Sequence, residues 1–246
     1  MENIKLVLRY DGTRYHGWQR QQNAVTIQQV VEQALERVVK SPVTLTGCSR
    51  TDAGVHAREY VCNARMSTSI PDDKMPYALN SILPDDIGVM SCQRVEDGFH
   101  ARFHAKAKEY CYLVHNARHK DPFLRNYAWH FPYPVQFDLM KRAAESLAGT
   151  YDCSVFEASG SDTKGLRVRT VYSCELIKAE EQIQLKICAN GYLYHMVRII
   201  MGTLLSIGTG KLAPDCIPSL IESRDRRQAG PTAPPQGLCL SRIWYQ

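Results

Sequence analysis

The sequence predicts an α+β fold made of two ferredoxin-like β-α-β-β-α-β halves. Apolar residues alternate along several short segments and recur at helical spacing along others. The order of elements that results occurs twice along the chain. We expect the strands of both halves to pair into one extended antiparallel sheet with helices packed on one face. The predicted halves are residues 1–105 and 106–246.

The first half opens with a strand in which Ile4, Leu6, Leu8 and Tyr10 alternate with other residues. Thr26 and Gln29 form a capping-box signature, and the helical spacing that follows predicts a helix as far as Val39. Further patterns predict strands over 43–48, 59–66 and 87–95 and a helix over 72–82.

The second half repeats this order with longer connections. Gly149 is expected to cap the C-terminus of its first helix. The predicted elements are a strand over 108–115, a helix over 136–148, strands over 167–177 and 182–189, a helix over 193–208, a shorter helix from Pro214 and a strand over 238–244.

Composition and charge point only weakly to a partner. The 246 residues carry a formal net charge of +5, with 44% hydrophobic and 22% charged residues, which is typical of globular proteins. A mildly basic chain favours a polyanion such as RNA. Nine cysteines without a C-x-x-C pair indicate reduced, mostly buried thiols in a cytoplasmic protein. We expect neither a signal peptide nor a membrane span.

The segment TGCSRTDAGVHARE (46–59) carries the most informative candidate, Asp52. One interpretation is a simple turn, because Asp-Ala-Gly suits turn geometry. The other is a catalytic carboxylate, which Arg50 and Arg58 would hold ionised and which would then serve as a nucleophile or base.

Arg198 lies on a segment that is otherwise apolar. It would either extend to the surface or lie buried, in which case it needs an acidic partner. No acidic residue stands three or four positions away, so Asp52 is the obvious candidate.

Other candidates have equally plain alternatives. Tyr110 and Tyr112 suit packing within a sheet as well as base stacking. His100 and His104 lack a third ligand, so we predict no metal site, and Arg102 between them is better explained as an RNA contact. Arginines and aromatic residues alternate in the loop 14–22, where Arg14 and Arg20 suit phosphate contact, as does RDRR (224–227); both segments also suit solvated surface.

The motif SRTDAGVHA resembles the signature of the tRNA pseudouridine synthase A family. Further stretches match in the same order: DGTRYHGWQRQ (11–21), FHARF (99–103), KEYCY (108–112), HMVR (195–198) and TAPPQGLCL (232–240). The sequence differs from the usual pattern at Ser49 and at Arg58-Glu59, which affects the expected shape of the loop and its phosphate contacts.

The resemblance implies a role for each matching residue. Asp52 is similar to the family nucleophile, Arg198 to the arginine that pairs with it, and Tyr110 to the tyrosine that packs on the uracil. Leu238 resembles an apolar contact to the flipped base, and Arg50 a residue that helps to expel and replace it. The resemblance also implies a homodimer that acts on a flipped-out uridine of the tRNA anticodon stem-loop, at about positions 38 to 40.

Three classes of function fit these residues: an RNA-modifying isomerase, a non-catalytic RNA-binding module, and a small-molecule enzyme with Asp52 as base. The chain lacks the RNP1 stretch of an RNA-recognition motif and the glycine-rich fingerprints of nucleotide enzymes. We therefore favour the isomerase, which needs no cofactor or metal because no atoms or electrons are gained. Attack at C1′ and a glycal route both remain open, as do Tyr110 and Asp52 as the base for the C5 proton.

Overall fold

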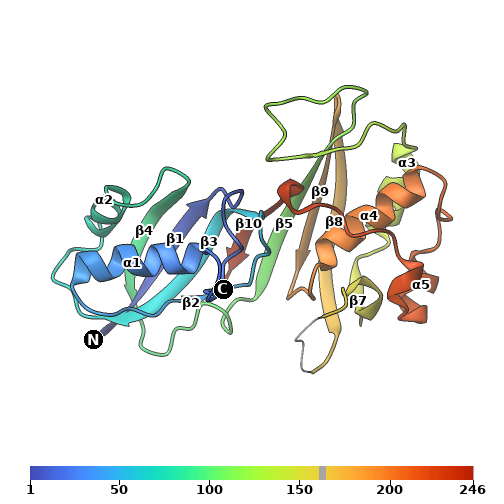
Figure 1. Cartoon of the computed structure of the whole chain (residues 1–246). Helices are drawn as coiled ribbons and strands as arrows, with labels where there is room; N and C mark the ends of the chain where they lie inside the picture. The colour runs from blue at the N-terminus through green and yellow to red at the C-terminus, as the bar shows by residue number, and fades with distance from the viewer. Residues whose placement is uncertain (161–164, 246) are drawn as a thin grey trace. The chain divides into compact units, whose positions relative to one another are not determined.

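The computed structural model describes residues 1–160 and 165–245. The chain forms two compact units, one from residues 1–106 together with 240–246 and the other from residues 107–239. Each unit combines helices with mostly antiparallel strands (Figure 1), so the predicted α+β class is confirmed. Within the described residues, no helix has both the length and the apolar character that crossing a bilayer requires.

The first unit has the predicted β-α-β-β-α-β order. Strand β1 pairs antiparallel with β3 on one side and β4 on the other, β2 pairs with β3, and β10 lies next to β3. The elements are β1 (Glu2–Tyr10), α1 (Ile27–Val39), β2 (Thr46–Gly47), β3 (His56–Met66), α2 (Met75–Asn80), β4 (Ile87–Val95) and, from the end of the chain, β10 (Leu238–Trp244).

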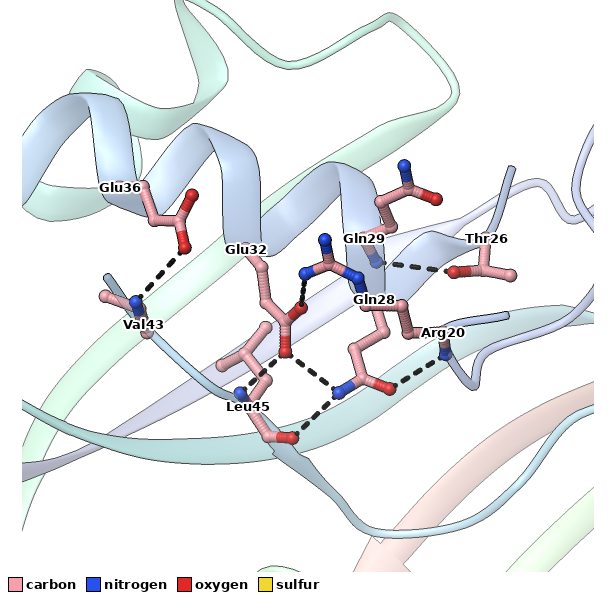
Figure 2. Close-up of polar contacts among 8 residues, drawn as sticks. All are labelled: Arg20, Thr26, Gln28, Gln29, Glu32, Glu36, Val43 and Leu45. Carbon is pink, nitrogen blue, oxygen red and sulfur yellow. Dashed lines mark hydrogen bonds and ion pairs between the residues drawn. The ribbon is translucent and has the colours of Figure 1, made fainter. Parts of the chain in front are cut away.

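Helix α1 begins where the capping signature predicts. The Thr26 hydroxyl accepts a hydrogen bond from the Gln29 amide at 3.4 Å (Figure 2). The helix lies across the sheet (Figure 1), and Ile27, Val31 and Leu35 form its fully buried face. This burial stabilises the helix more than its intrinsic propensity does.

The predicted strand over 43–48 is wrong except at Thr46 and Gly47. The amide of Val43 donates to the Glu36 carboxylate at 3.3 Å, and the amide of Leu45 donates to the Glu32 carboxylate at 2.9 Å (Figure 2). Because side chains of α1 take these amides, the segment runs beside the helix without a strand partner until residue 46.

Helices α2 and α3 are shorter than predicted at both ends, and two others begin three residues later than predicted, α4 at Met196 and α5 at Ile217. Helix α2 spans Met75–Asn80, and the Asn80 side chain bonds the backbone of Val89 in β4, which ends the helix. The C-cap of α3 (Phe137–Glu145) is Ser146, so the predicted cap at Gly149 is wrong. Gly149 instead opens a short strand with φ of +145°.

The second unit has a sheet in the order β5-β9-β8-β7, and β6 pairs with β5 in parallel. Helix α3 packs against β8 and against α4, and α4 packs against β5. The strands β6 and β7 were not predicted, because two and four residues are too short for a periodic signal. The remaining elements are β5 (Ala107–His115), β6 (Trp129–His130), β7 (Gly149–Asp152), β8 (Val168–Ala179), β9 (Gln182–Ala189), α4 (Met196–Gly208), α5 (Ile217–Ser223) and the 3-10 helices Ser154–Phe156, Arg226–Gln228 and Pro235–Gly237.

All nine cysteines lie in described parts of the chain, and none forms a disulfide. Cys48, Cys62, Cys153 and Cys174 are buried, and the other five are half-buried. Four of the nine thiols are fully buried, which is fewer than we expected.

Glu32 ties three parts of the first unit together, which gives a test of stability. Its buried carboxylate accepts from the Leu45 amide, from Gln28 Nε2 at 2.9 Å and from Arg20 Nη1 at 3.1 Å (Figure 2). Glu32→Ala should lower the free energy of unfolding by about 1–3 kcal/mol, because a buried N–H then loses its acceptor. Urea denaturation measures this loss.

Glu36→Ala is the matched control, since Glu36 lies one turn further along α1 and accepts from the same segment at a half-buried position. Water can replace its carboxylate there, so the loss should be smaller. Equal losses in the two variants would contradict the anchoring role of Glu32.

Candidate active site

Asp52 lies in a tight turn that leads directly into β3. The Asp52 carbonyl accepts from the Val55 amide at 3.2 Å, and Gly54, the third residue of the turn, has φ of +78°. A positive φ at this position is the feature of a type II turn, which favours glycine. The turn interpretation is therefore correct, and it holds Asp52 half-buried at the surface of the first unit. A turn of this kind does not exclude a catalytic role for its carboxylate.

A second loop, residues 11–18, lies backbone to backbone against this turn. The amide of Trp18 donates to the Thr51 carbonyl at 3.2 Å, and the amide of Gly54 donates to the Tyr15 carbonyl at 3.2 Å. These two bonds flank Asp52 in the sequence on either side. They fix the backbone that carries its carboxylate.

Two glycines make this close approach feasible. A Cβ on Gly17, where φ is +79°, would lie 2.2 Å from the Thr51 carbonyl oxygen, and a Cβ on Gly12 would lie 2.0 Å from that of Val55. Gly12 also donates its amide to His56 Nδ1 at 3.1 Å. The DG and HG pairs of the sequence are therefore needed for contact with the aspartate turn as well as for local bends.

Aromatic side chains support the segment that enters the turn. Trp18 is buried and stacks on Tyr60, with ring centroids 4.0 Å apart and planes at 26°. The Tyr60 hydroxyl donates to the Ser49 carbonyl at 2.5 Å. Burial raises the pKa of Tyr60 well above its usual value, so the phenol stays a neutral donor. The Tyr10 and Thr51 hydroxyls share a further bond of 2.9 Å.

The predicted RNA-contacting arginines of the first unit are all exposed, and two of them have identified carboxylate partners. Arg50, Arg58 and Arg102 are exposed. Arg14 pairs with Asp86 at 2.6 Å, with 70% of its side chain exposed, and Arg20 pairs with Glu32 at 3.1 Å, with 57% exposed. Each of these two pairs uses part of a guanidinium and leaves the rest accessible.

The second unit contains the other predicted residues. Tyr110 on β5 is buried and packs edge-on against Tyr192, with centroids 4.9 Å apart and planes at 80°. Arg198 is half-buried on α4, and its Nε donates to the Ala233 carbonyl at 2.7 Å. Leu238 is the first residue of β10, whose first two residues belong to the second unit, and it is 6% exposed. Tyr192 was not predicted, because a single aromatic residue in an irregular segment gives no periodic signal.

The basic cluster RDRR is tied into the second unit by its own contacts. Asp225 caps a 3-10 helix and binds Arg227 at 2.7 Å, and this pairing lowers the pKa of Asp225 to about 2. Arg224 lies 3.5 Å from Asp152, and Arg226 donates to Thr232 at 3.2 Å. Both bound carboxylates reduce the net positive charge that the cluster presents.

Gly17→Ala tests whether the aspartate turn depends on the neighbouring loop. The added methyl group would meet the Thr51 carbonyl in a backbone conformation that alanine rarely adopts. We expect a loss of about 1–3 kcal/mol from the strained backbone alone, with a further loss of activity as the turn shifts. Thermal melts and turnover assays measure the two effects.

Gly98→Ala is the matched control, because a Cβ added there would have no neighbouring atom within 4 Å and the φ of Gly98 is not positive. A Gly17→Ala protein with the melt and the turnover of the control would show that the loops are not mechanically coupled.

Comparison with known proteins identifies the family of the chain. The model of a family described as tRNA pseudouridine synthase matches residues 6–104 and 143–246. A tRNA pseudouridine synthase A of Thermoanaerobacter sp. (strain X514) is 51% identical over 245 residues, and one of Acetivibrio thermocellus is 45% identical; each alignment covers 100% of both chains. The solved archaeal box H/ACA sRNP Nop10-Cbf5 complex aligns with 82% of this chain and 43% of its own, with 12% identity and a TM-score of 0.38, which is too low to support an argument.

The matched stretches include both candidate regions of the chain, the aspartate turn of the first unit and the helix that carries Arg198 in the second. The alignment with the Thermoanaerobacter relative also covers residues 105–142, which the family model leaves out. The family resemblance predicted from the motifs is confirmed. The chain therefore belongs to the tRNA pseudouridine synthase family and is an isomerase of tRNA uridines.

Proposed function

We propose that this enzyme converts uridine to pseudouridine in the anticodon stem-loop of tRNA, at about positions 38 to 40, with Asp52 as the nucleophile acting on a flipped-out base. The observation that carries the proposal is the placement of Asp52. Its turn is hydrogen-bonded internally and to the loop 11–18, while its side chain remains half-exposed. A carboxylate on such a constrained backbone needs little reorganisation to meet a substrate.

The reaction balances within the nucleotide itself. The bond between C1′ and N1 breaks, the uracil turns, and a new bond joins C1′ to C5. N1 gains a proton, and C5 loses one to a base. Asp52 would either attack C1′ and form a covalent ester or assist formation of a glycal, and both routes release the carboxylate unchanged at the end. Tyr110 and Asp52 are the two candidates for the base.

We assign the remaining residues to binding and positioning in the same reaction. Tyr110 packs against the uracil, Leu238 contacts its apolar edge, and Arg50 helps to expel and replace the base. Arg198 pairs with the catalytic carboxylate. The exposed arginines at positions 14, 20, 58 and 102 contact phosphates, where accessible guanidinium groups suit an extended polyanion.

We also propose that the two halves of the chain share the active site. The N-terminal half carries the aspartate turn, and the C-terminal half supplies Arg198, Tyr110 and Leu238 to complete the active site. We further propose a cytoplasmic homodimer in which one tRNA contacts both subunits. The thiols without disulfides agree with a reducing compartment.

Asp52→Asn tests the nucleophile. The amide keeps the volume of the side chain but cannot attack C1′, so turnover should fall by at least about 1,000-fold, as loss of a nucleophile does elsewhere. Binding of tRNA should stay within a few-fold of the unmodified enzyme. Pseudouridine in digested tRNA and a binding titration measure the two quantities.

Asp73→Asn is the control, because Asp73 is exposed on the same unit and the substitution removes the same charge. A variant at position 52 that kept a tenth of normal turnover would remove Asp52 from the mechanism. Tight binding by the unmodified enzyme without any product would instead favour a non-catalytic RNA-binding module.

Arg198→Ala should reduce turnover far more than Arg58→Ala. Removing a positioned cationic donor from an active site costs about 100-fold or more, whereas an exposed rim charge affects mainly association. Arg198 is half-buried on α4 and Arg58 is exposed at the start of β3. Single-turnover rates at saturating tRNA distinguish a loss in the chemical step from a loss in association. Equal rates for Arg198→Ala and Arg58→Ala would show that Arg198 does not act with the carboxylate.

A further inference from the structure

Phe103 lies in the turn 99–104 of the first unit with 74% of its surface exposed. This turn connects β4 to β5 and is remote in sequence from the aspartate turn. A large apolar side chain at this exposure contributes little to the core. Its neighbour Arg102 is also exposed, so the turn presents an aromatic ring and a guanidinium together.

The turn is held in shape by His100. Nδ1 of His100 accepts from the amides of Arg102 at 3.1 Å and Phe103 at 3.2 Å, and the His100 carbonyl accepts from the His104 amide at 3.1 Å. The imidazole therefore acts as a cap for the turn.

A buried residue beneath anchors the same turn. Ala101 is fully buried; its amide donates to Asn63 Oδ1 at 2.9 Å, and its carbonyl accepts from the Tyr245 hydroxyl at 2.7 Å. Asn3 extends this anchor by donating to the Phe99 carbonyl at 2.9 Å. The side chains of Arg102 and Phe103 thus project from a backbone whose inner side is fixed.

The exposed side chains of Arg102 and Phe103 contact one another, and Phe103 stacks on half-buried His100. The rings of His100 and Phe103 lie 4.2 Å apart at their centroids, with planes at 28°, and the guanidinium carbon of Arg102 lies 5.8 Å from the Phe103 centroid. Unpaired RNA bases are bound by such flat side chains next to a positive charge. Because these side chains already stack on one another, they have less freedom to lose when a base binds.

We propose that the turn 99–104 is a stacking site for an unpaired base of the RNA substrate, with the ring of Phe103 against the base and Arg102 on a neighbouring phosphate. This inference rests on the proposed function, which makes tRNA the bound molecule. It adds a contact away from the reacting uridine. It accounts for two features together, an exposed aromatic ring and a turn that is rigid beneath it.

Phe103→Ala tests the site through tRNA binding. The Kd of this variant for tRNA should rise by about 5- to 150-fold, the range for loss of one base–aromatic stack. The slope of log K against log salt should stay the same, because no charge is removed. Arg102→Ala should reduce that slope by about 0.7–0.9, because it removes one phosphate contact. Phe103→Trp should bind as the unmodified enzyme does, whereas Phe103→Leu, apolar but not flat, should bind as weakly as the alanine variant.

Tyr77→Ala is the matched control, since Tyr77 is 75% exposed on the same unit and also has a cation, Lys74, 5.9 Å from its ring; its Kd should not change. Thermal melts check that each variant is folded, which the exposure of Phe103 favours. The proposal is overturned if Phe103→Ala binds tRNA like the control or if Phe103→Leu retains affinity. It is also overturned if Phe103→Ala changes the sedimentation of the protein without tRNA, because that result would mark a protein interface.

Pseudouridine is measured in the same samples. If the unmodified enzyme forms none, the proposed function fails, and the binding comparison among the Phe103 variants still decides the stacking site.

Discussion

The close approach of two backbones organises the first unit. The loop 11–18 and the turn at Asp52 exchange hydrogen bonds at Trp18 and Gly54, and the absent side chains of Gly12 and Gly17 leave the space for them. Backbone contacts of this kind allow little displacement, because a shift of either segment breaks hydrogen bonds that water cannot easily replace. Trp18, Tyr60 and the carboxylate of Glu32 extend the constraint into the core.

The regular parts of the fold were predictable because they depend on local patterns. Strands β4, β9 and β10 and the start of α1 agree with the sequence to the residue. The failures have a common cause in tertiary contacts. Residues 43–45 alternate as a strand would, yet their amides bond to side chains of α1. Asn80 and Ser146 end helices that periodicity alone would have continued.

The candidate site was predictable in identity and only partly in geometry. The motif around Asp52 identified the residue and its turn, since aspartate and glycine favour that conformation locally. The partners of the turn lie some 40 residues earlier in the chain, and a pattern of single glycines does not reveal which carbonyl they approach. Similarly, the arginines at 14 and 20 were recognisable as basic residues, whereas their partners Asp86 and Glu32 depend on the fold.

The last strand has a consequence for how the protein is made. Residues 240–246 belong to the first unit, where β10 lies next to β3 and Tyr245 bonds to Ala101. The whole second unit therefore emerges from the ribosome before the first unit can complete its sheet. Until then β2 alone covers part of this edge of β3, and the rest of the edge is a site for wrong pairing in a nascent chain. The N-terminal unit is thus the last to be completed. A chain that ended a few residues early would lack the last strand of that unit.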